Sequence, residues 1–255
     1  RGSVPYGVDL RAPLSGAAEG LTELGALDVE PARDGSLAAV MPDRVTPSQV
    51  TTALGLDHLS VSSAVGRDAG SVWVLRPPPL RVGRHTLTLI DSPAFGTGLH
   101  PTTALCLDAL RDAIDAEPPA NVLDVGTGSG VLALAALLLG VPHAVGIDID
   151  QEALRAAGAN ARPNGLEDRL QLVPGGPESL SGAWPLVLAN VLGAPLMEMS
   201  PALVRRVSRR GLLVLSGIPQ GVQEDVDRAY TRLGMQRLRV TPRGGWVALT
   251  HRAGW

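Results

Sequence analysis

The segment best suited to bind a cofactor is a glycine-rich run that begins with an acidic residue. Asp124–Gly130 reads D-V-G-T-G-S-G, follows the apolar residues of a short expected strand, and precedes an apolar helix. Glycine lets the backbone approach a ligand closely, and a helix N-terminus offers free N–H groups. Asp148 ends the next expected strand, where Rossmann-type sites place a carboxylate for ribose hydroxyls. We therefore predict a cofactor site that includes Asp124, Gly126, Gly128 and Asp148.

The spacing within this run separates two classes of cofactor. Dinucleotide enzymes use G-x-G-x-x-G, whereas this run is D-x-G-x-G-x-G. An aspartate at the end of the strand would repel a pyrophosphate and attract a ligand that carries a sulfonium and an amino group. The run resembles that of S-adenosylmethionine-dependent methyltransferases of the seven-strand, Rossmann-like class. This resemblance implies S-adenosyl-L-methionine as the cofactor.

Four motifs that occur in order carry a narrower resemblance. They are Ala94–Thr103 (A-F-G-T-G-L-H-P-T-T), Asp124–Gly130, Gly146–Asp150 (G-I-D-I-D) and Ala189–Leu192 (A-N-V-L). Over about residues 90–255 the chain resembles the bacterial ribosomal protein L-eleven methyltransferase family (PrmA family). That family joins a ferredoxin-like N-terminal domain, which grips the ribosomal protein, to a C-terminal methyltransferase domain. The resemblance implies an N-methyltransferase that acts on amino groups of this protein, with lysine as acceptor.

The run and the resemblance together assign roles to single residues. The expected cofactor contacts are Thr103, Asp124, Gly126, Gly128, Asp148 and Asn190. Asn190 is also the expected catalytic residue, because its side-chain carbonyl can orient an acceptor amine. Phe95 and His100 are expected to line the channel that admits the acceptor. No metal site is expected, because the five histidines are scattered and Cys106 is the one cysteine.

Other polar or reactive residues have simpler explanations. Asp150 is expected to cap the following helix, and Cys106 to pack within an apolar helix face. The pairs Arg205-Arg206 and Arg209-Arg210 are expected to end a helix, where cations suit the helix dipole.

Composition excludes several other classes of function. All 22 basic residues are arginine, so a Walker A lysine and a Schiff-base lysine are both excluded. A net charge of −3 argues against a general nucleic-acid binder, so no direct contact with nucleic acid is expected. The longest apolar run, Val131–Leu139, is too short to span a bilayer, and no signal segment opens the sequence. We therefore expect a cytoplasmic protein without membrane contact.

Residues 1–68 show the pattern of a small α+β domain. They predict the order strand, helix, strand, strand, helix, strand, which is that of a ferredoxin-like unit. Leu27–Glu30 and Leu37–Met41 form a predicted hairpin, and Thr46 is placed to cap the helix Ser48–Leu54. From the family resemblance, this domain is expected to recognise the substrate. Residues 69–98 form a predicted connector.

Residues 99–255 are predicted to form the methyltransferase domain, beginning with a helix at Thr102–Ile114. Strands and helices then alternate, as in a parallel sheet that is covered on both faces. The expected strands are 121–125, 144–148, 170–173, 186–190, 212–216, 236–240 and 246–251. The expected helices lie near 129–139, 151–162, 195–208 and 220–233. The predicted fold is therefore α/β, with a Rossmann-like seven-strand sheet preceded by the ferredoxin-like domain.

The identity of the substrate stays open between three hypotheses. The first 70 residues hold 9 acidic and 5 basic residues, a local charge of −4 that would attract a lysine-rich protein. The leading hypothesis, which the family resemblance implies, is methylation of a ribosomal protein. Leu99 and Pro185 depart from the family pattern. Leu99 and the short N-terminal region favour an alternative, a methyltransferase on the same core that acts on a small molecule or another protein. A third hypothesis is a module that binds the cofactor without catalysis.

Overall fold

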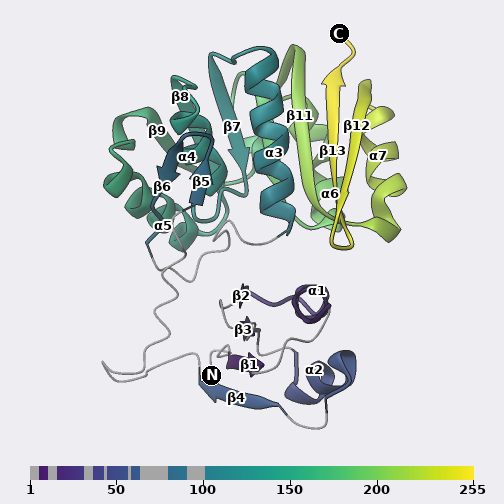
Figure 1. The fold of residues 1–255 in the computed structure, drawn as a ribbon. Coiled ribbons are helices and arrows are strands. Elements are labelled where there is room, and N and C mark those ends of the chain that lie inside the picture. The colour runs from purple at the N-terminus through teal and green to yellow at the C-terminus, as the bar shows by residue number, and fades with distance from the viewer. Residues whose placement is uncertain are drawn as a thin grey trace. The chain divides into compact units, whose positions relative to one another are not determined.

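The chain divides into two compact units, residues 1–75 and 76–255. The computed structural model describes residues 6–10, 16–31, 37–42, 45–56, 59–63, 80–90 and 101–255 (Figure 1). The predicted domain limits of 1–68, 69–98 and 99–255 stay predictions, because most of the predicted connector lies outside these residues.

The N-terminal unit has the ferredoxin-like order of elements. Its elements are β1 (Tyr6–Leu10), α1 (Ala17–Glu23), β2 (Asp28–Pro31), β3 (Leu37–Met41), α2 (Pro47–Leu54) and β4 (Ser60–Ser63). The strands pair antiparallel in the order β2-β3-β1-β4. This is the arrangement of a ferredoxin-like sheet, so the predicted strand and helix order is confirmed.

Local sequence explains where α2 of this unit begins and ends. The Thr46 hydroxyl accepts a hydrogen bond from Gln49 N, and Gln49 Oε1 accepts one from Thr46 N at 2.8 Å. This reciprocal capping box, with Pro47 at the first helical position, satisfies N–H groups that the helix itself leaves free. Gly55 ends the helix with a φ of 64°. The helices pack on the sheet through a small apolar core that includes Val8, Leu21, Met41 and Val50.

The second unit begins with a hairpin and continues with a seven-stranded sheet. Its helices are α3 (Pro101–Ala116), α4 (Val131–Leu138), α5 (Gln151–Ala161), α6 (Gly193–Val204) and α7 (Gln223–Thr231). The hairpin strands are β5 (Leu80–Val82) and β6 (His85–Leu87), and the sheet contains β7 (Asn121–Val125), β8 (His143–Asp148), β9 (Leu170–Pro174), β10 (Trp184–Asn190), β11 (Val207–Pro219), β12 (Met235–Arg243) and β13 (Trp246–Ala253). Short 3-10 helices lie at Arg162–Asn164, Glu167–Arg169, Pro177–Ser179 and Gln220–Val222.

The strand order of this sheet is β12-β13-β11-β10-β7-β8-β9. Strands β7 to β11 pair parallel, and β13 pairs antiparallel with both β11 and β12. Figure 1 shows α3 lying across the front of the sheet between β7 and β11. The predicted Rossmann-like sheet of seven strands is confirmed.

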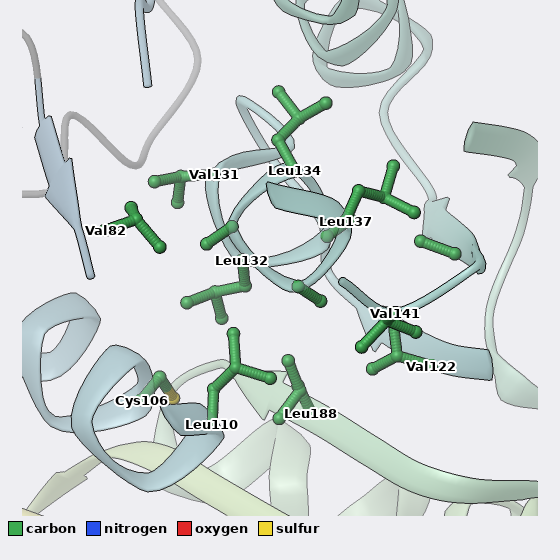
Figure 2. Packing of buried hydrophobic residues seen from close by; sticks show 14 of the residues in the cluster. Val82, Cys106, Leu110, Val122, Val131, Leu132, Leu134, Leu137, Val141 and Leu188 are labelled. Carbon is green, nitrogen blue, oxygen red and sulfur yellow. The ribbon is translucent and has the colours of Figure 1, made fainter. Parts of the chain in front are cut away.

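Side chains that alternate along each strand enter two separate apolar cores. Val122 of β7 and Leu188 of β10 pack with α3 and α4 on one face. Leu123 and Val187 pack with α6 and α7 on the other face. Figure 2 shows the first core, where side chains from α3, α4, the sheet and the β5–β6 hairpin converge. Because odd and even positions face opposite layers, the last side chain of each strand has a defined direction.

One predicted element is wrong in its extent. The helix predicted near 195–208 ends at Val204, and β11 begins at Val207. Val207 is buried and pairs with Trp184, so its β-branched side chain contributes to the sheet rather than to a helix. Arg209 and Arg210 therefore lie in β11 and do not end a helix as predicted. Of the four arginines, Arg205 occupies the C-cap position of α6.

Candidate functional site

The carboxyl ends of four neighbouring strands bring polar residues to one edge of the sheet. In the register of the sheet, Leu188 lies beside Asp124 and Asn190 lies beside Ser216. Asp148 ends β8, which pairs with β7. Ligands of open α/β sheets bind at this edge, where the strand order reverses on either side of the first strand. The structure therefore brings the predicted residues Asp124, Asp148 and Asn190 to the edge where a ligand is expected.

The glycine-rich loop between β7 and α4 adopts a conformation that requires glycine. Gly126, Gly128 and Gly130 have φ values of 69°, 55° and 80°, which residues with a side chain rarely adopt. The N–H groups of Gly126 and Thr127 both donate to Ile147 O at 2.9 Å, which ties the loop to β8. A Cβ atom on Gly126 would lie 2.8 Å from Val191 Cγ2. A larger residue at position 126 would therefore be strained and would force Val191, which follows β10, to shift.

Asp124 is buried beneath this loop, with 1% of its surface exposed. Its Oδ2 accepts hydrogen bonds from Thr127 Oγ1 at 2.7 Å and from Ala133 N at 3.2 Å. Burial raises the pKa of this carboxyl to about 6, although the two hydrogen bonds act in the opposite direction. Its Oδ1 is also buried and has no partner among the described residues. Asp124 thus holds the loop to α4 and retains one oxygen for another donor.

Asp148 is bonded to the same loop from the neighbouring strand. Its Oδ2 accepts a hydrogen bond from Gly128 N at 3.0 Å, and its Oδ1 accepts one from Asp150 N at 3.0 Å. The next residue, Ile149, is 85% exposed. Asp150 caps α5 by accepting a hydrogen bond from Glu152 N at 2.8 Å, so its predicted capping role is confirmed.

Asn190 and Thr103 meet, although they are far apart in the sequence. Asn190 Nδ2 lies 3.4 Å from Thr103 Oγ1, and Thr103 is fully buried in the first turn of α3. Asn190 Oδ1 is buried without a partner among the described residues. The Ser216 hydroxyl donates to Thr102 O at 3.1 Å and so fixes the start of α3 to β11. Sequence analysis missed Ser216, although it is a polar residue near the end of an apolar strand segment, the same signal that marked Asn190.

The remaining predicted site residues have different outcomes. Phe95 and His100 lie outside the described residues. Cys106 of α3 is fully buried in the first apolar core, as predicted for a packing residue (Figure 2). Burial raises the pKa of its thiol. In the described part of the chain, no three His, Cys, Asp or Glu side chains are grouped so that they could hold a metal ion. The same residues include no helix long and apolar enough to cross a membrane.

The chemistry of this edge fits the predicted cofactor. Asp124 Oδ1 and Asn190 Oδ1 are buried oxygens that can accept hydrogen bonds but receive none from the described residues. A buried acceptor of this kind gains from a ligand that brings a donor, such as an ammonium or hydroxyl group. The carboxylates of Asp124 and Asp148 favour a ligand with positive charge and disfavour a phosphate. These residues therefore suit an adenosyl ligand that carries an amino acid and a sulfonium.

Comparison with known proteins agrees with this chemistry. The family model described as "Ribosomal protein L11 methyltransferase (PrmA)" matches residues 84–253. The chain belongs to this family. Its predicted membership, and with it the class of S-adenosylmethionine-dependent methyltransferases, is confirmed.

Several curated relatives support the assignment. The ribosomal protein L11 methyltransferase of Pelobacter propionicus is 36% identical over 220 residues, which cover 78% of this chain and 71% of that protein. The protein of the same name from Chromohalobacter salexigens is 44% identical over 190 residues, covering 71% of this chain and 59% of that one. The corresponding protein of Methylococcus capsulatus is 46% identical over 164 residues, 64% of this chain and 55% of that one. The chain thus matches between about half and 71% of the length of these relatives.

Solved structures support the fold. The ribosomal protein L11 methylase of Lactobacillus delbrueckii subsp. bulgaricus has a TM-score of 0.58 and 31% identity, covering 63% of this chain and 81% of that one. A putative RNA methyltransferase of Pyrococcus horikoshii has a TM-score of 0.52 at 14% identity, covering 59% and 84%. The second of these shares the fold alone.

Proposed function

We propose that the protein transfers methyl groups from S-adenosyl-L-methionine to lysine and other amino groups of ribosomal protein L11. Family membership and the relatives that carry this name support the proposal. The main structural support is that Asp124, Asp148 and Asn190 lie together at one edge of the sheet. All three belong to sequence motifs of the family.

We assign the cofactor contacts to the loop and the three strand ends that surround it. When bound, S-adenosylmethionine supplies a methyl group that is activated on a sulfonium. Asp148 would accept hydrogen bonds from the ribose hydroxyls, while Gly126 and Gly128 let the loop backbone approach the ligand. Asp124 places its carboxyl under the loop, where negative charge favours the cationic end of the ligand. Thr103 and Asn190 would close the same pocket from α3 and β10.

The acceptor amine must lose a proton before it can attack a methyl group. A lysine has a pKa of about 10.4, so neutralising it at pH 7 costs about 4.6 kcal/mol. An apolar channel lowers this cost because desolvation disfavours the ammonium form. Asn190 Oδ1 would accept a hydrogen bond from the amine and direct its lone pair, and Phe95 and His100 would line the channel. The protein then contributes chiefly position and desolvation.

The N-terminal unit would recruit the protein substrate. The first 70 residues carry a charge of −4, which complements a basic ribosomal protein. We assign substrate recognition to residues 1–68 and the chemistry to residues 99–255.

The experiment uses ribosomal protein L11, free and within ribosomes, from a strain that lacks its own methylating enzyme. The purified protein is incubated with each and with S-adenosylmethionine labelled in the methyl group, and modified residues are mapped by mass spectrometry. Label on lysine and other amino groups of L11 is expected. Label only on small amines or on another protein would favour the alternative substrate. Cofactor binding without any transfer would leave a binding module.

A further inference from the structure

Asn160 is a buried polar residue that connects two parts of the methyltransferase unit. It lies on α5 and is 1% exposed. Its Nδ2 donates to Ser129 O at 2.8 Å, and its Oδ1 accepts a hydrogen bond from Ile90 N at 2.6 Å. Ser129 belongs to the glycine-rich loop, and Ile90 follows the β5–β6 hairpin. One side chain therefore joins the loop to a segment that precedes it by almost 40 residues.

The chemistry of the two partners fixes the orientation of this amide. A backbone carbonyl only accepts a hydrogen bond, and a backbone N–H only donates one. The Asn160 side chain must therefore point its nitrogen at Ser129 and its oxygen at Ile90. Aspartate would keep the acceptor for Ile90 but would place a second oxygen against the Ser129 carbonyl. Alanine would lose both bonds and leave the buried carbonyl of Ser129 and the part-buried N–H of Ile90 without this partner.

The packing of α5 brings Asn160 within reach of the loop. A Cβ atom on Gly130 would lie 3.0 Å from Ala157 Cβ, so the loop and α5 approach as closely as glycine allows. Ala157 is fully buried and precedes Asn160 by three residues, on the same face of the helix. The position of the Ser129 carbonyl therefore depends on α5.

Asn164 provides an internal comparison, because it holds the hairpin segment without the loop. Its Oδ1 accepts a hydrogen bond from Thr88 N at 3.0 Å, and its Nδ2 donates to Thr88 O at 2.7 Å. It also donates to Asn160 O at 2.7 Å. Both asparagines thus stabilise residues 88–90, but the hydrogen bond to the loop is made by Asn160.

We propose that Asn160 is a positioning residue that fixes the cofactor-binding loop against residues 88–90 and couples the order of one to the other. This inference rests on one part of the proposed function, namely that the glycine-rich loop binds the adenosyl cofactor. A ligand that orders the loop then also orders the peptide at Ile90, and the coupling acts equally in both directions. Loss of Asn160 weakens ligand binding although the side chain lies behind the loop.

The test measures binding of S-adenosylhomocysteine by calorimetry and hydrogen exchange at the Ile90 amide. Asn160→Ala is expected to weaken binding roughly tenfold, within the usual range for coupled sites. Asn164→Ala, the matched control, is expected to change affinity by less than about twofold while both variants lower the melting temperature. In the wild-type protein the ligand slows exchange at Ile90, and in Asn160→Ala this slowing is lost.

Asn160→Asp separates the two bonds if Asn160→Ala does not fold. The aspartate retains an oxygen that accepts the hydrogen bond from Ile90 N, but its second oxygen repels the Ser129 carbonyl. Affinity for S-adenosylhomocysteine is therefore expected to fall, while hydrogen exchange at the Ile90 amide stays slow even without ligand. Equal affinity in the wild type and the Asn160 variants would overturn the inference, as would equal losses in the Asn160 and Asn164 variants. Ile90 exchange that does not respond to ligand in the wild type would overturn it as well. A wild-type protein that binds no S-adenosylhomocysteine would instead overturn the proposed function.

Discussion

The side chains of Asp124 and Thr127 meet beneath the glycine-rich loop, with 2.7 Å between Asp124 Oδ2 and Thr127 Oγ1. The same oxygen accepts a hydrogen bond from Ala133 N, so one carboxyl joins the end of β7, the loop and the first turn of α4. Burial raises the pKa of this carboxyl to about 6. A residue that shapes the glycine-rich loop is therefore also one whose charged form the fold disfavours.

This shift predicts how stability depends on pH. The pKa of Asp124 is higher in the folded protein than in the unfolded chain. The contribution of this carboxyl to the free energy of unfolding is therefore fully present below about pH 4 and is lost as pH rises through about 6. A shift of about two units corresponds to about 3 kcal/mol. Asp124→Asn stays neutral, so its free energy of unfolding relative to the wild type should rise by about that amount between pH 4 and pH 7.5. Denaturant titrations measure this difference, and one that is independent of pH would contradict the prediction.

Substitutions of the two aspartates in the G-I-D-I-D motif are expected to have different effects, one on cofactor affinity and the other on stability. Asp148→Ala should weaken S-adenosylmethionine binding by the loss of one or two charge-assisted hydrogen bonds, about 1.5–3 kcal/mol each. Asp150→Ala should lose its cap on α5, about 1 kcal/mol of stability, with little change in cofactor affinity. Calorimetry and thermal unfolding of both variants distinguish these outcomes. Tight binding of NAD by the wild type, without S-adenosylmethionine binding, would contradict the cofactor assignment itself.

Asn190→Ala is expected to lower turnover more than cofactor affinity. The Asn190 carboxamide faces Thr103 and retains a buried oxygen, which we assign to the acceptor amine. Loss of an interaction made mainly in the transition state lowers kcat and kcat/KM together. Asn121→Ala, at the amino end of β7 and so at the opposite edge of the sheet, is the control and should leave both unchanged. Normal turnover with weaker cofactor binding would make Asn190 a binding residue alone.

Much of the fold follows from local signals in the sequence. Leu37–Met41 and Asn121–Val125 form strands with the predicted bounds, because each is a short, mainly apolar segment flanked by polar or turn residues. Thr46 caps α2 as predicted. The early start of β11 was missed because Val207 gains its strand conformation from pairing with Trp184, which no local pattern encodes.

The polar residues Asp148 and Asn190 could be predicted from the sequence alone, whereas Thr103 was predicted from the family resemblance, and Ser216 and Asn160 were missed. Asp148 and Asn190 were found because polar residues that follow apolar strands collect at one sheet edge. Asn160 lies on the buried face of α5, where its periodicity with Ala153 and Ala157 shows burial but not a partner. Its partners are backbone groups of Ser129 and Ile90, and only the folded chain brings these near.

The division of the chain at residues 75 and 76 allows the recruitment role to be tested directly. A protein of residues 76–255 retains the loop, Thr103 and the β5–β6 hairpin, whose Val82 and Leu87 belong to the core of the methyltransferase unit. We expect it to fold and to bind S-adenosylmethionine with the affinity of the whole chain. Thermal unfolding and calorimetry establish both points before any activity is measured.

Methylation of ribosomal protein L11 by this shortened protein should then collapse. Binding energy from a remote docking unit positions the target amine, so its loss lowers turnover as well as substrate affinity. Activity of the whole chain should also fall as salt rises, because the N-terminal charge of −4 attracts a basic substrate through forces that salt screens. An enzyme for a small molecule would show neither dependence. Full activity of residues 76–255 on L11 would therefore remove the recruitment role and favour the alternative substrate, while cofactor binding in the same sample would show that the unit itself is intact.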